Sequence, residues 1–298
     1  MKIVRATEQL VVNNTNVMIY GSPGTGKTSC AFTASKPLCL DFDHGSHRSG
    51  YRGDTVIINS WSEVSGLGPK DLADYSTVIL DTVGRALDYL IMEIGSRDRR
   101  LVRESGEPTL QGYGELKSTF ARWVKGILTL GKDVIFLAHD KEARNGDDLY
   151  IRPDITGGTY HEIFKLCDAV GRLHKRGDDK TVLDFSPRGE CLGKNPAGLQ
   201  PLVVPSFDDE PNWFAGQVAA IKQGMGRIAK TQVQAVEDLE EFKAECGFVE
   251  TADDANTLLG IDKYFKGNKS MVAQRKKLLQ VRVTELGITY DKKQKAFV

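Results

Sequence analysis

The sequence predicts an α/β fold with a mainly parallel, twisted sheet flanked by helices, followed by a small helical region. Two observations support this prediction. Through roughly the first two thirds of the chain, short apolar runs alternate with helical patterns, which is typical of strands joined by crossover helices. After Pro211 the pattern becomes helical and charged. We therefore expect an α/β domain over residues 1–211 and a helical, basic C-terminal region over residues 212–298.

Each element is predicted from its own pattern. Buried strands are expected at the short apolar runs, which are residues 16–20, 37–42, 55–59, 77–81 and 133–138. Helices are expected at residues 28–34, 83–94, 115–130 and 160–166. A loop is expected over residues 96–113, then a hairpin up to residue 152, then two antiparallel strands over residues 169–175 and 181–185. The C-terminal region is expected to form helices over residues 233–245, 252–259 and 270–286.

Composition restricts the class of protein. The chain has 298 residues, 40% of them hydrophobic, and its 40 Lys and Arg balance 40 Asp and Glu, so it is not basic overall. A local basic patch remains compatible with nucleic-acid binding. The five cysteines form no Cys-x-x-Cys pair, which argues against a disulfide framework or a zinc site. The first residues hold no long apolar run, and no stretch is long enough to span a bilayer. We expect a soluble, cytoplasmic protein that has no membrane contact.

A glycine-rich segment, Gly21-Ser-Pro-Gly-Thr-Gly-Lys-Thr28, matches the pattern G-x-x-x-x-G-K-[ST] between a predicted strand and a predicted helix. Its glycines let the backbone curl so that N–H groups point at an anion, and the following helix adds its positive end. Lys27 supplies a charge for the β- and γ-phosphates, and the Thr28 hydroxyl is a ligand for Mg²⁺. The sequence therefore predicts ATP and Mg²⁺ as cofactors. The residues expected to hold the nucleotide are Gly21, Ser22, Pro23, Gly24, Thr25, Gly26, Lys27, Thr28 and Ser29.

Asp81 is the expected second metal residue. It ends the apolar run Thr77-Val-Ile-Leu, so it is expected at the carboxyl edge of the sheet, beside the phosphate loop. There it can hold Mg²⁺ through a water molecule, as in the Walker-B arrangement. The alternative is an aspartate that only caps the helix from Val83. The phosphate loop upstream favours the metal role.

A general base is expected at the end of the second strand. The sequence contains no Asn-Lys-x-Asp guanine motif, and Asp81 is followed by Thr82 rather than by a glutamate. The base must therefore come from elsewhere. In Leu40-Asp-Phe-Asp-His44, Asp43 could reach a water molecule in line with the γ-phosphate. The alternative is that Asp41 and Asp43 are polar loop and capping residues.

In this order, the segments resemble the RecA-like recombinase ATPases. The resemblance extends over about residues 14–198. The segments on which it rests are the phosphate loop, residues 40–45, 78–82 and 136–139, and Cys167-Asp-Ala-Val-Gly-Arg172. In that family a strand ends in an acid followed by His, and the acid, usually Glu, is the catalytic base; here the pair is Asp43-His44. A later strand ends in a polar residue, often Gln, that senses the γ-phosphate. His139 stands at that place, although Asp140 could instead simply satisfy its imidazole.

More narrowly, the chain looks like the phage-encoded RecA-like ATP-binding proteins of the AAA type, which include the Sak-type single-strand annealing proteins. The resemblance implies a DNA-stimulated ATPase with Lys27, Asp43, Asp81 and His139 as its catalytic residues. It also implies action on single-stranded DNA in recombination, annealing or replication, in the cytoplasm of a host cell. A phage or host single-strand-binding protein is a further expected partner.

Three basic stretches are candidates for nucleic-acid contact, and the alternative for each is a solvated charged face. The one-sided charge of the third stretch favours nucleic acid. The first is the predicted loop with Arg97, Arg99, Arg100 and Arg103. The second follows His139 and holds Lys141, Arg144 and Arg152 around Tyr150, an aromatic that could stack on a base. The third is the tail from Lys263 to Val298, with ten Lys and Arg against two acids. Its clustered members are Lys269, Arg275, Lys276 and Lys277.

The resemblance also implies self-association, because RecA-like ATPases work as rings or filaments with the nucleotide between subunits. A basic residue of the neighbour then stabilises phosphate charge. Arg188 and Lys194 stand where the resemblance would put it, with a surface turn as the alternative. Two other functions remain open. One is an ATP-switched assembly or loader protein whose tail binds a protein partner, and the other is a small-molecule kinase that uses the arginines of residues 97–103.

Overall fold

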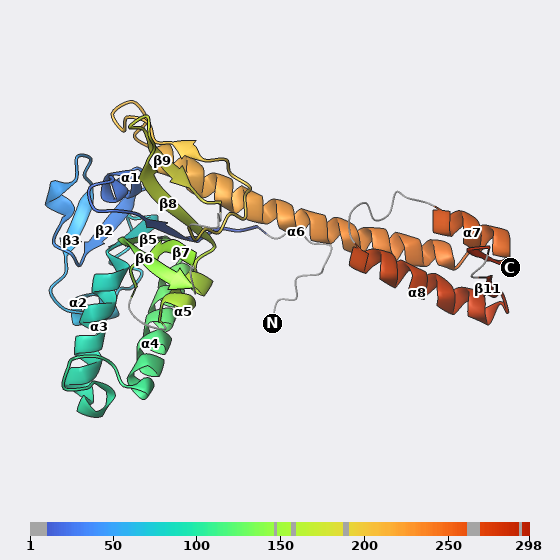
Figure 1. Cartoon of the computed structure of the whole chain (residues 1–298), viewed down its shortest axis with the longest axis horizontal. Helices are drawn as coiled ribbons and strands as arrows, with labels where there is room; N and C mark the ends of the chain where they lie inside the picture. Colours follow the sequence, from blue (N-terminus) through green and yellow to red (C-terminus); the bar gives the residue numbers. More distant parts are fainter. Residues whose placement is uncertain (1–10, 146–147, 156–158, 187–190, 261–268, 292–293) are drawn as a thin grey trace. The chain divides into compact units, whose positions relative to one another are not determined.

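A computed structural model describes residues 11–145, 148–155, 159–186, 191–260, 269–291 and 294–298. The chain divides into two compact units, one over residues 12–225 and the other built mainly from residues 226–298. An eight-stranded sheet with the order β10-β9-β8-β1-β5-β4-β2-β3 forms the centre of the first unit (Figure 1). No helix of the described residues is both long enough and apolar enough to cross a bilayer.

Six neighbouring strands of this sheet pair in parallel. At one edge β9 pairs antiparallel with β8, and β10 pairs antiparallel with β9. The strands are β1 (Asn16–Tyr20), β2 (Pro37–Asp41), β3 (Asp54–Ile57), β4 (Thr77–Asp81), β5 (Asp133–Ala138), β8 (Ala169–Lys175), β9 (Thr181–Asp184) and β10 (Leu202–Val203). A separate hairpin is formed by β6 (Asp140–Asn145) and β7 (Asp148–Pro153). This arrangement confirms the predicted α/β fold class with a mainly parallel sheet.

Helices cover both faces of the sheet because its central strands are apolar on both sides. Met18 and Tyr20 of β1 face one core, and Val17 and Ile19 face the other. The first core is covered by α2 (Ser62–Ser65), α3 (Val83–Arg97), α4 (Leu110–Thr129) and α5 (Thr159–Leu166). The second is covered by α1 (Lys27–Phe32) and by the start of α6 (Trp213–Cys246). Short 3₁₀ turns occur at η1 (Ser46–Arg48) and η2 (Arg99–Leu101).

The strand register brings the polar ends of several strands to one edge. Asp41 of β2 pairs with Asp81 of β4, and Asp81 pairs with Leu137 of β5. Tyr20, which precedes the phosphate loop, pairs with Ala138. Because these strands are parallel, the segments that follow them emerge side by side.

The predicted antiparallel pair over residues 169–175 and 181–185 is present as β8 and β9, and β8 also pairs parallel with β1. Two sequence predictions are corrected. The predicted loop over residues 96–113 ends sooner, because the Thr109 hydroxyl accepts a hydrogen bond from the Gly112 N–H and starts α4 at Leu110. A helix begins at Trp213 rather than near residue 233, because Phe214, Val218 and neighbouring residues pack on the sheet.

The second unit is built around its own small core. It contains the last part of α6, α7 (Ala252–Gly260), α8 (Lys269–Glu285) and a hairpin of β11 (Tyr290–Asp291) and β12 (Ala296–Phe297). Phe242, Leu258, Leu279 and Val283 are among its buried residues. The predicted boundary at residue 211/212 falls just before α6, whereas the division between the units falls within α6, after Met225.

Candidate functional site

The phosphate loop connects β1 to α1, and its glycines meet specific steric demands. Gly24 and Gly26 have φ angles of 77° and 87°, in the left-handed region that side chains rarely adopt. A Cβ on Gly21 would lie 2.1 Å from the carbonyl oxygen of Leu173. Any larger residue at position 21 would therefore push the loop away from β8.

Lys27 is held inside the loop. Its side chain is buried, and Nζ donates hydrogen bonds of 2.8 Å and 2.9 Å to the carbonyl oxygens of Gly21 and Ser22. Burial lowers the pKa of this ammonium group, while the nearby Asp81 raises it. Lys27 is thus a cation partly withdrawn from water, which strengthens its attraction for an incoming phosphate.

Thr28 and Asp81 meet at the carboxyl edge of the sheet. The Thr28 hydroxyl donates a 2.7 Å hydrogen bond to Oδ2 of Asp81. Burial raises the pKa of Asp81 to about 6, and the hydrogen bond from Thr28 partly offsets that rise. A hydroxyl and a carboxylate are hard oxygen ligands of the kind that Mg²⁺ prefers, so this pair fits the expected metal.

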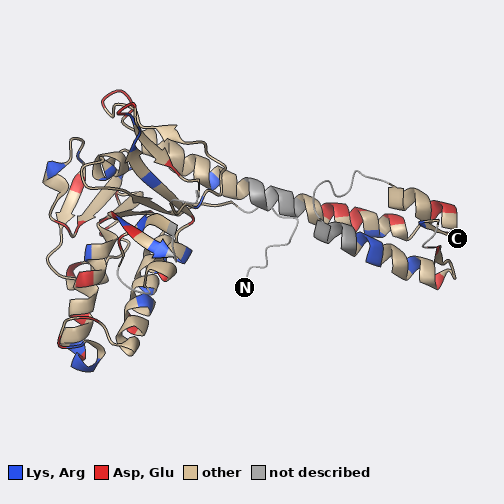
Figure 2. Ribbon diagram, viewed as in Figure 1, with Lys and Arg blue, Asp and Glu red and all other residues tan. Residues whose placement is uncertain are grey.

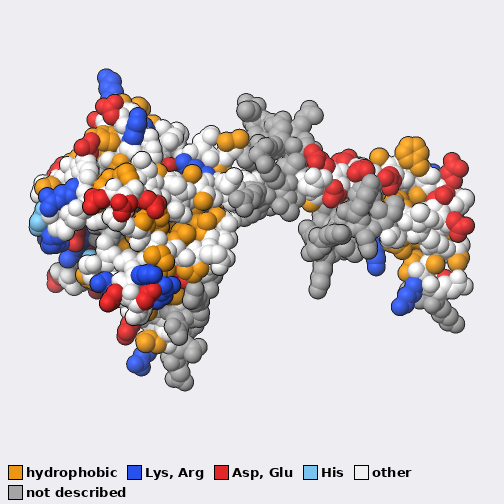
Figure 3. Space-filling view, turned by 90° about the horizontal axis from the view of Figure 1, so that it is seen from above, with side chains coloured by type: hydrophobic (Ala, Val, Ile, Leu, Met, Phe, Trp, Pro, Cys, Tyr) orange, Lys and Arg blue, Asp and Glu red, His pale blue; other side chains and the backbone are white. Residues whose placement is uncertain are grey.

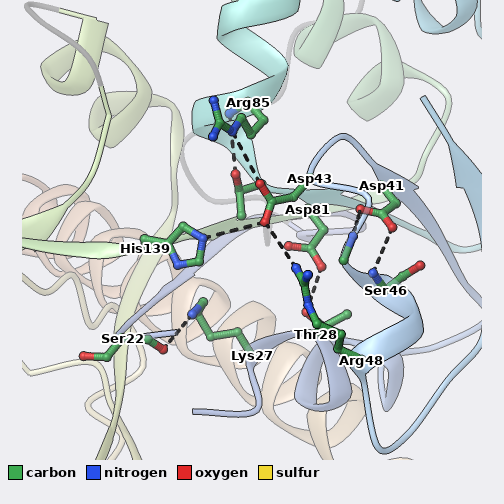
Figure 4. Close-up of polar contacts among 12 residues, drawn as sticks. Ser22, Lys27, Thr28, Asp41, Asp43, Ser46, Arg48, Asp81, Arg85 and His139 are labelled. Atoms are coloured by element: carbon green, nitrogen blue, oxygen red, sulfur yellow. Dashed lines mark hydrogen bonds and ion pairs between the residues drawn. The ribbon is translucent and has the colours of Figure 1, made fainter. Parts of the chain in front are cut away.

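Asp43 lies among the guanidinium groups of Arg48 and Arg85 and the imidazole of His139 (Figure 4). Its carboxylate lies 3.4 Å from Nε of Arg85, and 3.9 Å from both Nη2 of Arg48 and Nε2 of His139. Burial is the main cause of a lowered pKa for His139, and the nearby Lys27 lowers it further. Asp41 has a different role from Asp43: it is buried, and its carboxylate accepts the N–H groups of Gly45 and Ser46.

One cavity of about 430 Å³ connects the phosphate loop with Asp81, Asp43 and His139. It is lined by Pro23, Gly24, Gly26, Lys27, Thr28, Ser29, Asp43, Gly45, Arg48, Ser49, Gly50, Asp81 and His139. The structure thus brings together the predicted catalytic residues and most of the predicted nucleotide-binding residues. Of the latter, Ser22 contacts the neighbouring Asp140, with its hydroxyl 3.0 Å from Oδ1, and Thr25 lines an adjacent cavity.

The adjacent cavity, of about 320 Å³, contains residues that the sequence did not single out. Tyr51 and Phe207 both line it and contact each other edge to face, with ring centroids 5.9 Å apart. Gly26, Ser29 and Gly50 line both this cavity and the phosphate cavity, so the two cavities share a wall. No motif spacing connects residues 51 and 207, and only the packing of the loop after β10 against α1 reveals the pair.

Another residue outside the predicted set is Arg172, within the segment that carried the resemblance. Its Nη2 lies 3.4 Å from Oδ2 of Asp140, and Asp140 also accepts the Ser22 hydroxyl. These contacts connect β8 and the start of β6 to the phosphate loop.

The arginines of residues 97–103 lie at the end of the α3–η2 segment (Figure 2). Three are paired with acids: Arg97 with Glu93, Arg100 with Asp98 and Arg103 with Glu107. Because these arginines are paired with Glu93, Asp98 and Glu107, this first candidate stretch is a mixed surface rather than a uniformly basic one. The face of the first unit that is visible in Figure 3 also holds interspersed acidic and basic side chains.

The β6–β7 hairpin begins directly after His139. Lys141 forms an ion pair with Asp154, and Arg144 is exposed. Arg152 is half-buried, with Nη1 donating to the carbonyl oxygens of Pro153 and Ile155 and the guanidinium 5.0 Å from the ring centre of Tyr160. The Arg152 side chain is therefore engaged within the protein, whereas Arg144 is exposed to solvent.

The prediction that Arg275 belongs to an exposed basic cluster is wrong. Its side chain is buried, Nη2 donates to the carbonyl oxygens of Leu258 and Leu259, and the guanidinium packs on Phe242. Arg275 thus satisfies the carbonyl end of α7. Lys276 and Lys277 are exposed on α8, which begins at Lys269.

Of the two candidates for a contact in trans, Lys194 is engaged within its own chain. Its Nζ donates to the carbonyl oxygen of Cys167 and lies 5.8 Å from the ring centre of Phe164. Arg188 lies outside the described residues.

A family model described as AAA domain matches residues 13–197. No curated protein matches the chain. Among solved structures, the crystal structure of the RadB recombinase is 14% identical and has a TM-score of 0.36, with 60% of this chain and 85% of that chain covered. A KaiC-like protein from Pyrococcus horikoshii OT3 is 11% identical and has a TM-score of 0.36, with 64% and 89% covered.

Proposed function

Because this chain belongs to the AAA domain family, we propose that it binds and hydrolyses ATP with Mg²⁺. The observation that carries the proposal is the contact of Thr28 with Asp81 in the same cavity as Lys27. A cation, a hydroxyl and a carboxylate converge there beside a loop whose glycines leave space for a phosphate chain. Mg²⁺ held by Thr28 and Asp81 would neutralise phosphate charge.

The cavity lined by Tyr51 and Phe207 is proposed as the site of the adenine base. It shares Gly26, Ser29 and Gly50 with the phosphate cavity, so a single nucleotide can extend from one cavity into the other. Aromatic faces stabilise a stacked base by about 1–3 kcal/mol. This assignment gives the two adjoining cavities to two parts of one ligand.

Hydrolysis is proposed to use Asp43 as the base. The water oxygen forms a bond to the terminal phosphorus, the bond to the bridging oxygen of ADP breaks, and Asp43 accepts a proton from the water. His139 lies in the same cavity and can donate a hydrogen bond to a terminal phosphate oxygen. Positioning and electrostatics supply most of the rate in such a site.

Single-stranded DNA is the proposed partner of the ATP-bound protein, in a recombination, annealing or replication process of a phage. The β6–β7 hairpin supports this proposal. The N–H of Asp154, at its end, donates a 2.7 Å hydrogen bond to the carbonyl oxygen of His139, so a shift of His139 would reach the hairpin. Arg144 is its exposed cation. Self-association into a ring or filament, with Arg188 as the candidate residue in trans, remains part of this proposal.

A second function, that of an ATP-switched loader with little DNA affinity, is favoured by the charges of the C-terminal unit. Residues 226–298 contain thirteen Lys and Arg against eleven Asp and Glu, so the basic tail is nearly balanced by acids of the same unit. Acidic residues of α6 and basic residues of α8 are visible in that unit in Figure 2. The buried Arg275 removes one further cation from the surface.

The test has two steps. ATP affinity and turnover are measured for the wild type and Lys27→Ala, and retention of a fluorescent oligonucleotide is then measured with ADP and with a non-hydrolysable ATP analogue across salt. We expect Lys27→Ala to lose ATP binding and turnover, and the analogue to promote salt-sensitive oligonucleotide binding. Unchanged ATP binding by Lys27→Ala would contradict the ATPase proposal. ATP binding without nucleotide-dependent retention of DNA would instead favour the loader.

A further inference from the structure

Arg48 stands in the phosphate cavity without a role in the proposed function. It ends the 3₁₀ turn η1, after β2, and lines the cavity together with Lys27, Thr28 and Asp81. Figure 4 shows its guanidinium directed toward Asp43, to which Nη2 lies at 3.9 Å. The side chain is 66% exposed, so it is free to change its rotamer.

The backbone that carries Arg48 is fixed relative to the phosphate loop. On one side, the buried carboxylate of Asp41 accepts the N–H groups of Gly45 and Ser46 at 3.1 Å and 2.9 Å. On the other, Oγ of Ser49 lies 2.7 Å from Oγ of Ser29, which belongs to the first turn of α1. The position at which Arg48 leaves the backbone is therefore set by both β2 and α1.

The two arginines beside Asp43, Arg85 and Arg48, contact it differently. Arg85 lies 3.4 Å from Asp43 and 3.3 Å from Asp88, and it does not line the cavity. Arg48 forms a longer contact of 3.9 Å with Asp43, and it does line the cavity. A terminal phosphate carries more negative charge than a carboxylate and accepts paired hydrogen bonds from a guanidinium. Such a group would draw Arg48 away from Asp43 and leave Arg85 in place.

We propose that Arg48 binds the terminal phosphate of ATP within the same chain, so that one subunit by itself distinguishes ATP from ADP. This inference rests on the proposed ATP site. When Arg48 moves from Asp43 to the phosphate, Asp43 also loses one neighbouring cation. Asp43 is the group proposed to accept the proton of water. A cation that reaches the terminal phosphate in cis supplies the charge that a neighbouring subunit would otherwise have to bring.

The first experiment measures dissociation constants for ADP and for a non-hydrolysable ATP analogue with Mg²⁺, using the wild type, Arg48→Ala, Arg48→Lys and Arg85→Ala. We expect Arg48→Ala to weaken analogue binding about 10-fold or more while ADP binding stays within about twofold. Arg48→Lys should recover part of the loss, and Arg85→Ala should leave the ratio of the two constants unchanged. Retained ADP binding by Arg48→Ala establishes that the site is folded.

Two results would overturn the inference while the ATPase proposal stands. One is an unchanged ratio in Arg48→Ala, and the other is an equal change in Arg85→Ala, which would mean that the effect passes through Asp43. If the wild type bound neither ADP nor the ATP analogue, both the proposed ATP site and this inference would be overturned. A second experiment mixes Arg48→Ala with Lys27→Ala: restored analogue binding would show an arginine acting between subunits and would contradict the role in cis.

Discussion

The Thr28 hydroxyl donates a 2.7 Å hydrogen bond to the carboxylate of Asp81, which lies 53 residues further along the chain. This contact joins the end of the phosphate loop to the end of β4. Asp81 is 6% exposed, and its carboxylate is surrounded by protein rather than by water. The properties of the site therefore depend on the charge state of this one group.

Folding stability is expected to depend on pH through Asp81. Its pKa is raised from 3.8 to about 6 in the folded protein, so the folded state binds this proton more tightly than the unfolded state. The stabilisation is fully present below pH 3.8 and is lost as pH rises through 6. Asp81→Asn should remove this loss, which amounts to roughly 3 kcal/mol in the nucleotide-free protein. Urea unfolding of both proteins from pH 4 to 8 checks the difference, and identical pH dependence would contradict it.

Mg²⁺-dependent nucleotide binding should show the opposite trend with pH. The metal requires the ionised carboxylate, so affinity should fall about tenfold for each pH unit below 6. Titration of MgATP against the wild type at pH 5 and pH 7 measures this fall. ATP without Mg²⁺ is the control, and an equal fall without the metal would assign the effect to another group.

Loss of the carboxylate at position 43 should reduce turnover more than binding. Asp43→Asn is expected to lower kcat about 10²–10⁴-fold, because the amide cannot accept the proton of water. Affinity for ATP should change only a few-fold. Asp88→Asn is the matched control, since Asp88 shares Arg85 with Asp43 but does not line the cavity. Turnover of Asp43→Asn near the wild-type rate would exclude Asp43 as the base.

Removal of either ring of the proposed base site should weaken ATP binding. Tyr51→Ala and Phe207→Ala are each expected to raise the dissociation constant for ATP by about 5-fold to 100-fold through lost stacking. Affinity for inorganic triphosphate, which has no base, should not change. Equal losses for ATP and triphosphate would show that the aromatic pair acts by holding the phosphate loop.

Arg275 and its neighbours on α8 should respond differently to substitution. Arg275→Ala is expected to destabilise the C-terminal unit by about 2 kcal/mol, because the carbonyl groups of Leu258 and Leu259 lose their donor. A Lys276→Ala/Lys277→Ala double variant should keep that stability. Hydrogen exchange of the α7 amides distinguishes the two. Normal protection in Arg275→Ala would contradict a structural role.

Several elements could be predicted from local sequence because their signals are local. The apolar runs that became β1, β4 and β5 are buried from end to end, so hydrophobicity alone locates them. The end of the second strand was also located, and with it Asp43. The start of α4 at Leu110 was missed, because a glycine-bearing polar segment looks like a loop until the Thr109 cap is in place.

The phosphate loop can be recognised in the sequence, because each of its residue types meets a demand of the local backbone or of a bound phosphate. Which distant residues lie beside the loop depends on how the chain folds. Strand register and loop packing bring Tyr51 next to Phe207. They also bring Arg48 and His139 next to Asp43. No local sequence pattern encodes these contacts. The same cause explains Arg275. Its charge predicts a position on the surface, and only the packing of α6, α7 and α8 shows that its guanidinium is buried and bound to carbonyl groups.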